Sequence, residues 1–218
     1  ISFLVGKSYT DVQHLATTDN HSQTYTGELV SSFNIEATYG EIMTGSFSTS
    51  GNGYTQEAPS FEQQVVTAGG TVNPAGTTNP INSSIDIGLV TSDDVATDFC
   101  IQSLSLTLDN GLSEQTCLGK AAPTAYTLGT ADIQISMTIY NSDTSYDAFM
   151  VKKLTQEPVS ITYIAENIDG GFAFHAEAIQ LSFPDPAATG QNEDTFLEAE
   201  GVGKVGSAGE SALRIYKL

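Results

Sequence analysis

Three histidines, His14, His21 and His175, are the residues of this chain best suited to metal binding or proton transfer. None of them lies at a metal-ligand spacing from a cysteine, aspartate or glutamate. The chain also has no Gly-x-Ser-x-Gly elbow, no phosphate-binding glycine loop ending in lysine, and no calcium loop of alternating Asp and Asn. We therefore interpret the histidines as structural residues, and we predict neither a metal site nor a cofactor.

Carboxylates near the C-terminus could in principle form the acid pair that glycoside hydrolysis requires. The chain contains no tryptophan, however, so it lacks the usual aromatic floor of a sugar subsite. Carboxylates beside loops are most often solvated. We predict that the protein is not an enzyme. The carboxylates considered are Asp185, Glu193, Asp194, Glu198 and Glu200.

The two cysteines, Cys100 and Cys117, flank the turn signal Asp109-Asn110-Gly111. A two-residue hairpin turn at Asn110-Gly111 would place Leu104, not Cys100, opposite Cys117. Because that register separates the sulfur atoms, we predict two free, partly buried thiols.

The net charge is the most unusual feature of the composition, because 26 acidic residues face 7 basic ones and give −19. Proteins gain affinity for DNA when Lys and Arg release condensed counterions, so direct DNA binding is not expected. Solubility in a salty medium is the alternative explanation of this charge. No apolar run is long enough to span a membrane.

Several runs alternate between apolar and polar residues with the period of a half-buried strand. Leu104, Leu106 and Leu108 form one such face. A second face belongs to residues 133–139, and a third run covers residues 29–37, where odd-numbered residues are predicted on one side and Val30 with the even-numbered residues on the other. The apolar face of the second run consists of Ile133, Ile135, Met137 and Ile139.

One short helix is expected at about 143–157, because four apolar residues there share one face and Pro158 follows. Its packing face is predicted to contain Tyr146, Phe149, Met150 and Leu154. With many short strands and one helix, the chain is predicted to be mainly β, a single domain over 1–218. Strands over 195–218 are predicted to close it. Ile1 in place of Met predicts that upstream residues were processed away or lie outside this sequence.

Residues 67–84 form the longest turn-rich segment, with two Asn-Pro pairs and three glycines that disfavour regular structure. Long irregular loops in compact domains are usually either functional or disordered, and both alternatives stay open here. In the functional alternative this loop is an arm that contacts a neighbouring subunit.

The order of these motifs resembles the phage major tail tube proteins of long, non-contractile-tailed phages. Tyr25-Thr26-Gly27 leads into LVSSFNIEA and then MTGSFSTSG. LSLTLDNGL, CLGK, TLGTADIQISMTIY and YDAFMVKKL follow, and the chain ends with IQLSFPDP and ALRIYKL. The resemblance covers most of the chain from about Tyr25 onward, although no single motif is diagnostic.

The resemblance implies a tail-tube-like β-sandwich or half-barrel with one flanking helix, which completes a β-barrel across a hexameric ring. Such rings stack into a hollow helical tube through which genomic DNA passes without specific binding. It further implies tail terminator, tape measure and distal tail proteins as partners, assembly in the host cytoplasm and a place in the virion tail. A tube protein of a contractile or secretion system is a related alternative.

Residues facing the lumen would be polar members of alternating strands, either Gln134, Ser136 and Thr138 or the alternative pair Glu36 and Glu41. An acidic wall would let DNA slide without sticking. A secreted acidic β-sandwich that acts as an adhesin or carbohydrate-binding module is the alternative function. The loop residues expected to contact another subunit are Thr71, Val72, Asn73, Pro74, Asn79, Pro80 and Ile81.

Overall fold

The computed structural model describes residues 9–14, 22–51, 53–57, 79–91, 100–120, 122–140, 143–182, 195–203 and 213–218. In these ranges the chain is mainly β with one short helix, as predicted. The elements are β1 (Tyr9–His14), β2 (Ser22–Thr38), β3 (Thr44–Ser50), β4 (Tyr54–Glu57), β5 (Ile87–Thr91), β6 (Ile101–Asp109), β7 (Ser113–Gln115), β8 (Ala125–Thr127), β9 (Asp132–Tyr140), α2 (Asp143–Thr155), β10 (Val159–Asn167), β11 (Gly170–Ser182), β12 (Phe196–Gly203) and β13 (Leu213–Lys217).

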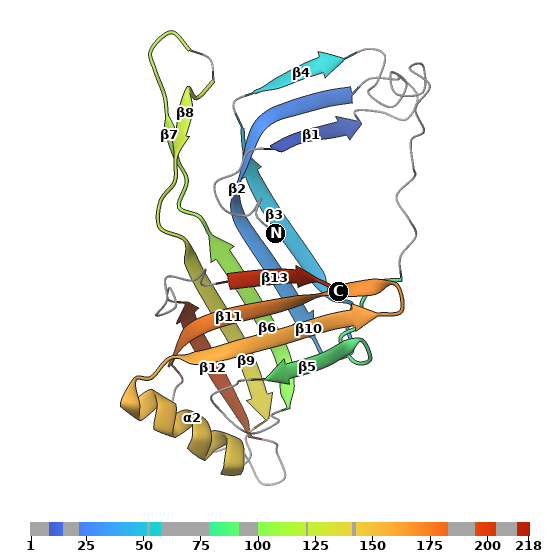
Figure 1. Ribbon diagram of the computed structural model, residues 1–218, viewed down its shortest axis with the longest axis vertical. Coiled ribbons are helices and arrows are strands. Elements are labelled where there is room, and N and C mark those ends of the chain that lie inside the picture. The colour runs from blue at the N-terminus through green and yellow to red at the C-terminus, as the bar shows by residue number, and fades with distance from the viewer. Residues whose placement is uncertain are drawn as a thin grey trace.

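Eleven of these strands belong to one antiparallel sheet, in the order β1-β2-β6-β9-β12-β11-β10-β5. The strands β3 and β4 also pair with β2, and β13 also pairs with β11. The long strand β11 joins two layers, because Ile179–Ser182 pair with β12 while Phe172–Ala176 pair with β13. The sheet therefore curls over itself into the predicted half-barrel (Figure 1). The strands β5, β10, β11 and β13 cross β6, β9 and β12, and we call these four strands the crossing layer.

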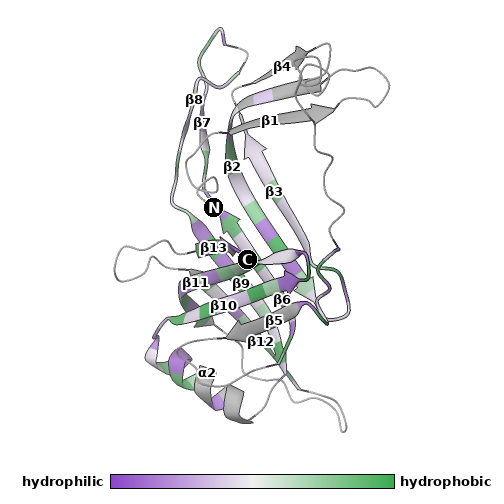
Figure 2. Cartoon of the chain, turned by 45° about the vertical axis from the view of Figure 1, so that its right-hand side comes forward, coloured by the Kyte–Doolittle hydropathy of each residue, from purple (hydrophilic) through white to green (hydrophobic). Residues whose placement is uncertain are grey.

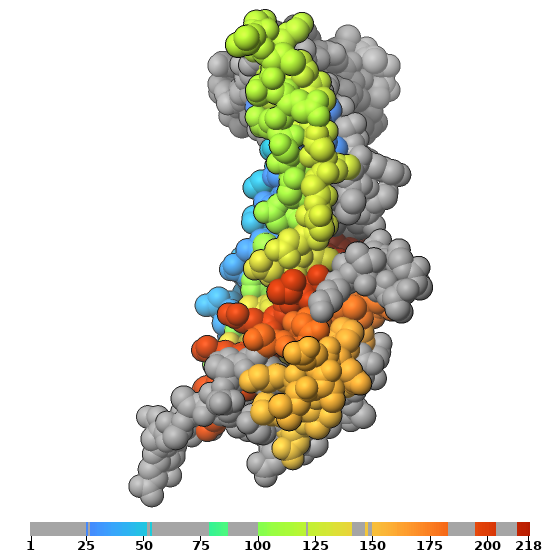
Figure 3. Space-filling view, turned by 90° about the vertical axis from the view of Figure 1, so that its left-hand side faces the viewer, coloured from blue at the N-terminus to red at the C-terminus, as the bar shows by residue number. Residues whose placement is uncertain are grey.

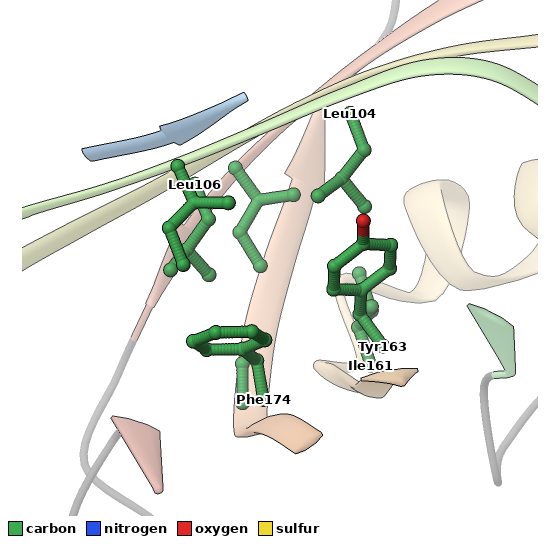
Figure 4. Close-up of a pocket in the computed structure, with 8 residues that line it drawn as sticks. Leu104, Leu106, Ile161, Tyr163 and Phe174 are labelled. Atoms are coloured by element: carbon green, nitrogen blue, oxygen red, sulfur yellow. The ribbon is translucent and has the colours of Figure 1, made fainter. Parts of the chain in front are cut away.

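The hydrophobic core lies between these two layers and follows the alternation of the sequence. Leu104 and Leu106 of β6 face Ile161, Tyr163 and Phe174 of the crossing layer (Figure 4). The cavity between them measures about 10 Å³, which is close to the minimum for one water molecule. The interior therefore offers no ligand site at this position. The predicted apolar faces of β6 and β9 are buried, which confirms them: Leu104, Leu106, Leu108, Ile133, Ile135, Met137 and Ile139.

The strand β2 departs from simple alternation at a β-bulge. Its register with β3 shifts between Val30 and Ser32, so Val30 turns to the buried side while Ile35 and Ala37 keep their predicted side. The prediction that Val30 lies on the polar face is therefore wrong. Beyond the bulge, hydrophobic and hydrophilic residues alternate along β2 (Figure 2).

Core-facing residues of β12 become smaller along the strand, from Leu197 and Ala199 to Gly201 and Gly203. A Cβ at Gly201 would overlap Ile179 Cγ2, and a Cβ at Gly203 would lie 2.8 Å from Ile133 Cβ. Gly201 therefore leaves the space that β11 needs where it passes from the crossing layer to the edge of β12, and Gly203 leaves space for the Ile133 side chain of β9.

The helix α2 ends at Thr155, and Gln156 follows with a φ of 55°. Met150 is half-buried and packs against the core. Leu154 is 76% exposed, so its predicted place on the packed face is wrong within a single chain. The side chains of Tyr146 and Phe149 lie outside the described part of the structure.

The connection between β6 and β9 is a long hairpin arm, which we define as residues 110–131 and which contains β7 and β8. Gly111 has a φ of 55° and its N–H donates to Asp109 Oδ1, so the predicted turn exists. It opens the arm instead of a tight hairpin, since β6 pairs with β9. Cys100 and Cys117 are free as predicted, but both are exposed, so the prediction of partial burial is wrong.

Candidate functional site

The polar side chains of the long strands gather on one surface, opposite the core. We call this surface the polar face, and it consists of the outward residues of β2, β6, β9 and β12. Cross-strand partners in an antiparallel sheet share a face. The register aligns them in rows such as Glu36–Ser105–Ser136–Glu200, and the flanking rows are Asn34–Thr107–Gln134–Val202 and Thr38–Ser103–Thr138–Glu198.

Hydrogen bonds between side chains connect the polar face along and across the strands. Asn34 Nδ2 donates to Glu36 Oε1 at 2.9 Å, and Ser103 Oγ donates to Thr138 Oγ1 at 3.0 Å. Gln134 Nε2 donates to Asp132 Oδ2 at 2.9 Å. The surface is hollowed over β6, β9 and β12 by a shallow depression of about 350 Å³. It is therefore a concave, hydrogen-bonded and solvated wall.

The charge of the polar face has a single sign. The strands β2, β3, β6, β9 and β12 contain no lysine or arginine, so no basic side chain of these strands offsets their carboxylates. A concave surface lined by one sign of charge concentrates its field. The polar face therefore repels anions. Its carboxylates are those of Glu36, Asp109, Asp132, Glu198 and Glu200.

The residues predicted as two alternative sets facing a lumen lie on one surface, with one exception. Gln134, Ser136 and Thr138 share the polar face with Glu36, which the sequence offered as an alternative. Glu41 lies elsewhere, in the exposed turn after β2, where its N–H donates to Thr38 O.

The polar face ends at a strand edge that is open among the described residues. The strand β3 pairs with β2 on one side, and none of the described strands pairs with its other side. Phe47 of β3 lies opposite Phe33 in the register and is 63% exposed. An uncovered edge with an exposed aromatic side chain is typical of a surface that another chain covers.

Comparison with known families agrees with this geometry. The family model described as phage tail tube protein matches residues 2–203. The chain belongs to the phage tail tube protein family. No curated protein matches the chain. A tail tube protein is a structural component of the virion tail, so the alternative of a secreted surface module is not supported.

The predicted inter-subunit loop of this tail tube protein is described in part. Asn79 N–H donates to Asp169 Oδ2 at 2.9 Å, and Asn167 Nδ2 donates to Asn79 O at 2.7 Å. Ile81 packs against the core of its own chain, and Pro80 between them is exposed. These contacts anchor the end of the loop to the turn between β10 and β11. The predicted contact residues Thr71, Val72, Asn73 and Pro74 lie outside the described residues.

The described residues of this tail tube protein include few groups suited to proton transfer or metal binding. His175 Nδ1 lies 2.9 Å from Thr162 Oγ1, and its Nε2 lies 3.2 Å from Glu177 Oε2. Arg214, the one arginine of the chain, reaches the same carboxylate at 3.6 Å and links β13 to β11. Across the described ranges, no three His, Cys, Asp or Glu side chains are grouped to hold a metal ion. None of the described helices has the length and hydrophobicity to cross a membrane.

Asn110 is an important residue that sequence reasoning missed, because it resembled an ordinary turn residue. It is buried, its Nδ2 donates to Val30 O at 2.8 Å, and its N–H donates to Ser31 O at 2.8 Å. The residue therefore closes the β2 bulge from the end of β6. The Asn-Gly pair was a visible signal of a turn, but not of this contact.

Proposed function

We propose that this tail tube protein is a non-enzymatic building block that assembles into hexameric rings, which stack into a hollow helical tube. The polar face lines the bore, and genomic DNA passes through it from capsid to host cell. The observation that carries the proposal is the polar face itself, a concave wall with five carboxylates and no base on its strands. Membership of the tail tube family supports it.

Ring closure follows from the two ends of the polar face. One end is the open edge of β3. The other end is the first half of β12, where Phe196–Ala199 pair with β9 on one side and the pairing with β11 begins only at Glu200. If β3 of one copy pairs with β12 of the next, the edges disappear into a continuous barrel. A head-to-tail contact of this kind closes into a ring when its rotation divides a full turn. Phe47 would then be covered by the neighbouring copy.

The acidic wall gives the tube its transport property. DNA carries one negative charge per roughly 1.7 Å of helix axis, so a basic wall would bind it and release counterions. Five carboxylates per chain repel the duplex instead, and DNA slides without sticking. Tail terminator, tape measure and distal tail proteins would meet the ends of the tube, and assembly would take place in the host cytoplasm.

A charge reversal on the polar face tests this function. In phage carrying Glu200→Lys, we expect tails of normal shape but slower DNA ejection, because a lysine in every subunit binds passing phosphates. Added salt should restore the rate, since phosphate contacts weaken with ionic strength. Glu166→Lys is the matched control, an exposed glutamate at the end of β10 in the crossing layer. Ejection at the normal rate from intact Glu200→Lys tails, or equal slowing by Glu166→Lys, would contradict the proposal.

A further inference from the structure

The hairpin arm is the element of the chain least explained by the fold. It rises from β6 and β9 and stands clear of the two core layers (Figure 3). At its base Gly111 and Gly129 touch, so closely that a Cβ on Gly129 would overlap Gly111 O. Tyr126 fixes the arm to the connection between β3 and β4 by donating to Gly51 O at 2.6 Å. Burial, together with the Glu114 and Glu28 carboxylates, raises the pKa of the Tyr126 hydroxyl and keeps it a donor.

The tip of the arm presents an apolar side chain that no described residue covers. Leu118 is fully exposed there, with a relative exposure of 106%. The arm is thus positioned rigidly at its base while its tip offers an apolar anchor to solvent. A large exposed apolar side chain on an ordered projection is typical of an interaction site.

A second exposed apolar surface lies on α2. Val151 is 57% exposed and Leu154 is 76% exposed, while Met150, one turn before Leu154, packs against the core. Lys152 bonds Glu157 at 3.0 Å just beyond them, which orders the end of the helix. The helix therefore contacts its own chain through Met150 and leaves the adjacent apolar residues Val151 and Leu154 exposed.

Charge indicates that these two surfaces can meet in different copies of the chain. Two copies that each carry −19 repel one another over most of their surfaces. The arm carries one acid, Glu114, and one base, Lys120, so its net charge is zero. The segment 143–155 carries two aspartates and two lysines and is also neutral. Contact between these two segments adds no repulsion to the burial of apolar side chains.

The positions of the arm and the helix fit a stacked assembly. The arm lies at one end of the long axis of the molecule and α2 lies towards the other (Figures 1 and 3). Displacing a copy along this axis brings the arm of one copy to the helix of the next. Such a head-to-tail contact does not close on itself and propagates along a filament.

We propose that the arm of one copy docks through Leu118 on the Val151–Leu154 surface of α2 in a copy of the adjacent ring. This proposal rests on the proposed stacking of rings, and it names the contact that holds successive rings together. The occupant of each surface is a second copy of this chain.

Site-specific cross-linking tests the contact. Cys117 lies next to Leu118 and is exposed, so the native chain already carries one reactive group at the tip of the arm. In a Cys100→Ser background, Leu154→Cys supplies the second group on α2. A short bis-maleimide reagent is preferable to a disulfide, which tolerates little variation in geometry. The matched control is Ile168→Cys, which is 93% exposed in the turn between β10 and β11.

We expect tubes of the Leu154→Cys protein to yield a ladder of covalent multimers on a denaturing gel, and tubes of the Ile168→Cys protein to yield at most a trace. Tubes without a ladder, or an equal ladder from the control, would overturn the docking proposal and leave the tube intact. Failure of the unmodified protein to form rings or tubes would overturn the proposed function and this contact with it.

A charge-pair rescue gives an independent readout. Leu118→Asp should leave rings intact but raise the protein concentration needed for tubes at least about tenfold, because it removes an apolar anchor and adds an acid. Adding Leu154→Lys should restore tubes, whereas adding Ile168→Lys should not. Rescue by both lysines alike, or unchanged tubes with Leu118→Asp alone, would contradict the contact.

Discussion

Gly201 is the residue where the curl of the sheet can be tested most sharply. Replacing it with alanine adds one methyl group, which would overlap Ile179 Cγ2 and lie 3.3 Å from Leu181 Cδ2. Both neighbours belong to β11 and are buried, so neither can move into solvent. We expect Gly201→Ala to destabilise the fold by roughly 1–3 kcal/mol, the usual cost of overpacking a core.

The sign of this effect is informative. Where an added methyl group meets no obstacle, Gly→Ala stabilises a protein by about 0.4–1 kcal/mol, because the unfolded chain loses freedom. For a chain of this size, each kcal/mol shifts the melting temperature by about 2–4 °C, so a fall of about 2–12 °C is expected. Scanning calorimetry on dilute protein measures it. Gly45→Ala is the comparison, because its Cβ would lie 3.3 Å from Asn34 O and 3.7 Å from Ile35 Cγ1, so it should cost less than Gly201→Ala.

A second substitution identifies the clash. Ile179→Leu removes Cγ2, the atom that the new methyl group would overlap, at a cost of less than about 1.5 kcal/mol. The double variant Gly201→Ala/Ile179→Leu should therefore be more stable than the sum of the two single effects allows. A Gly201→Ala protein as stable as the wild type, or strict additivity in the double variant, would refute this explanation of the curl.

Two further substitutions test the core and the bulge by urea unfolding. Burial raises the pKa of the Tyr163 hydroxyl above the usual value of about 10, so the unfolded chain ionises first as the pH rises. The stability contributed by the neutral phenol is complete below that pH and is lost above it. Tyr163→Phe should therefore lose less stability than the wild type between pH 9 and pH 11. Parallel losses of stability in the two proteins would contradict this explanation. Asn110→Ala should lower the free energy of unfolding by about 1–3 kcal/mol, because it removes the side-chain donor to Val30 O. The exposed control Gln115→Ala should leave the stability nearly unchanged. An Asn110→Ala protein as stable as the wild type would contradict the role of Asn110 at the bulge.

Much of the fold could be predicted because strand period and burial agree. From Leu104 to Leu108 in β6 and from Ile133 to Ile139 in β9, each second residue is apolar and buried. The same alternation predicted that Gln134, Ser136 and Thr138 share a polar surface. The relative position of Glu36 could not be predicted, because it depends on the pairing of β2 with β6, which lies far along the sequence.

The remaining differences arise from single residues that a periodic pattern does not encode. The bulge at Ser31 reverses the direction of Val30, and its stabilising partner, Asn110, comes from another strand. The helical period placed Leu154 with Met150, yet the helix contacts its own chain along a narrower face. The arm was hidden because short strands such as β7 and β8 have too few residues to show a period.

A cryo-electron microscopy reconstruction of the assembled protein tests the proposed tube most directly. We expect six copies per ring, hydrogen bonds between β3 of one copy and β12 of its neighbour, and Glu36, Ser136 and Glu200 facing the bore. A tube whose bore is lined by the crossing layer of β10 and β11, or a particle in which the edge of β3 stays uncovered, would contradict the proposal.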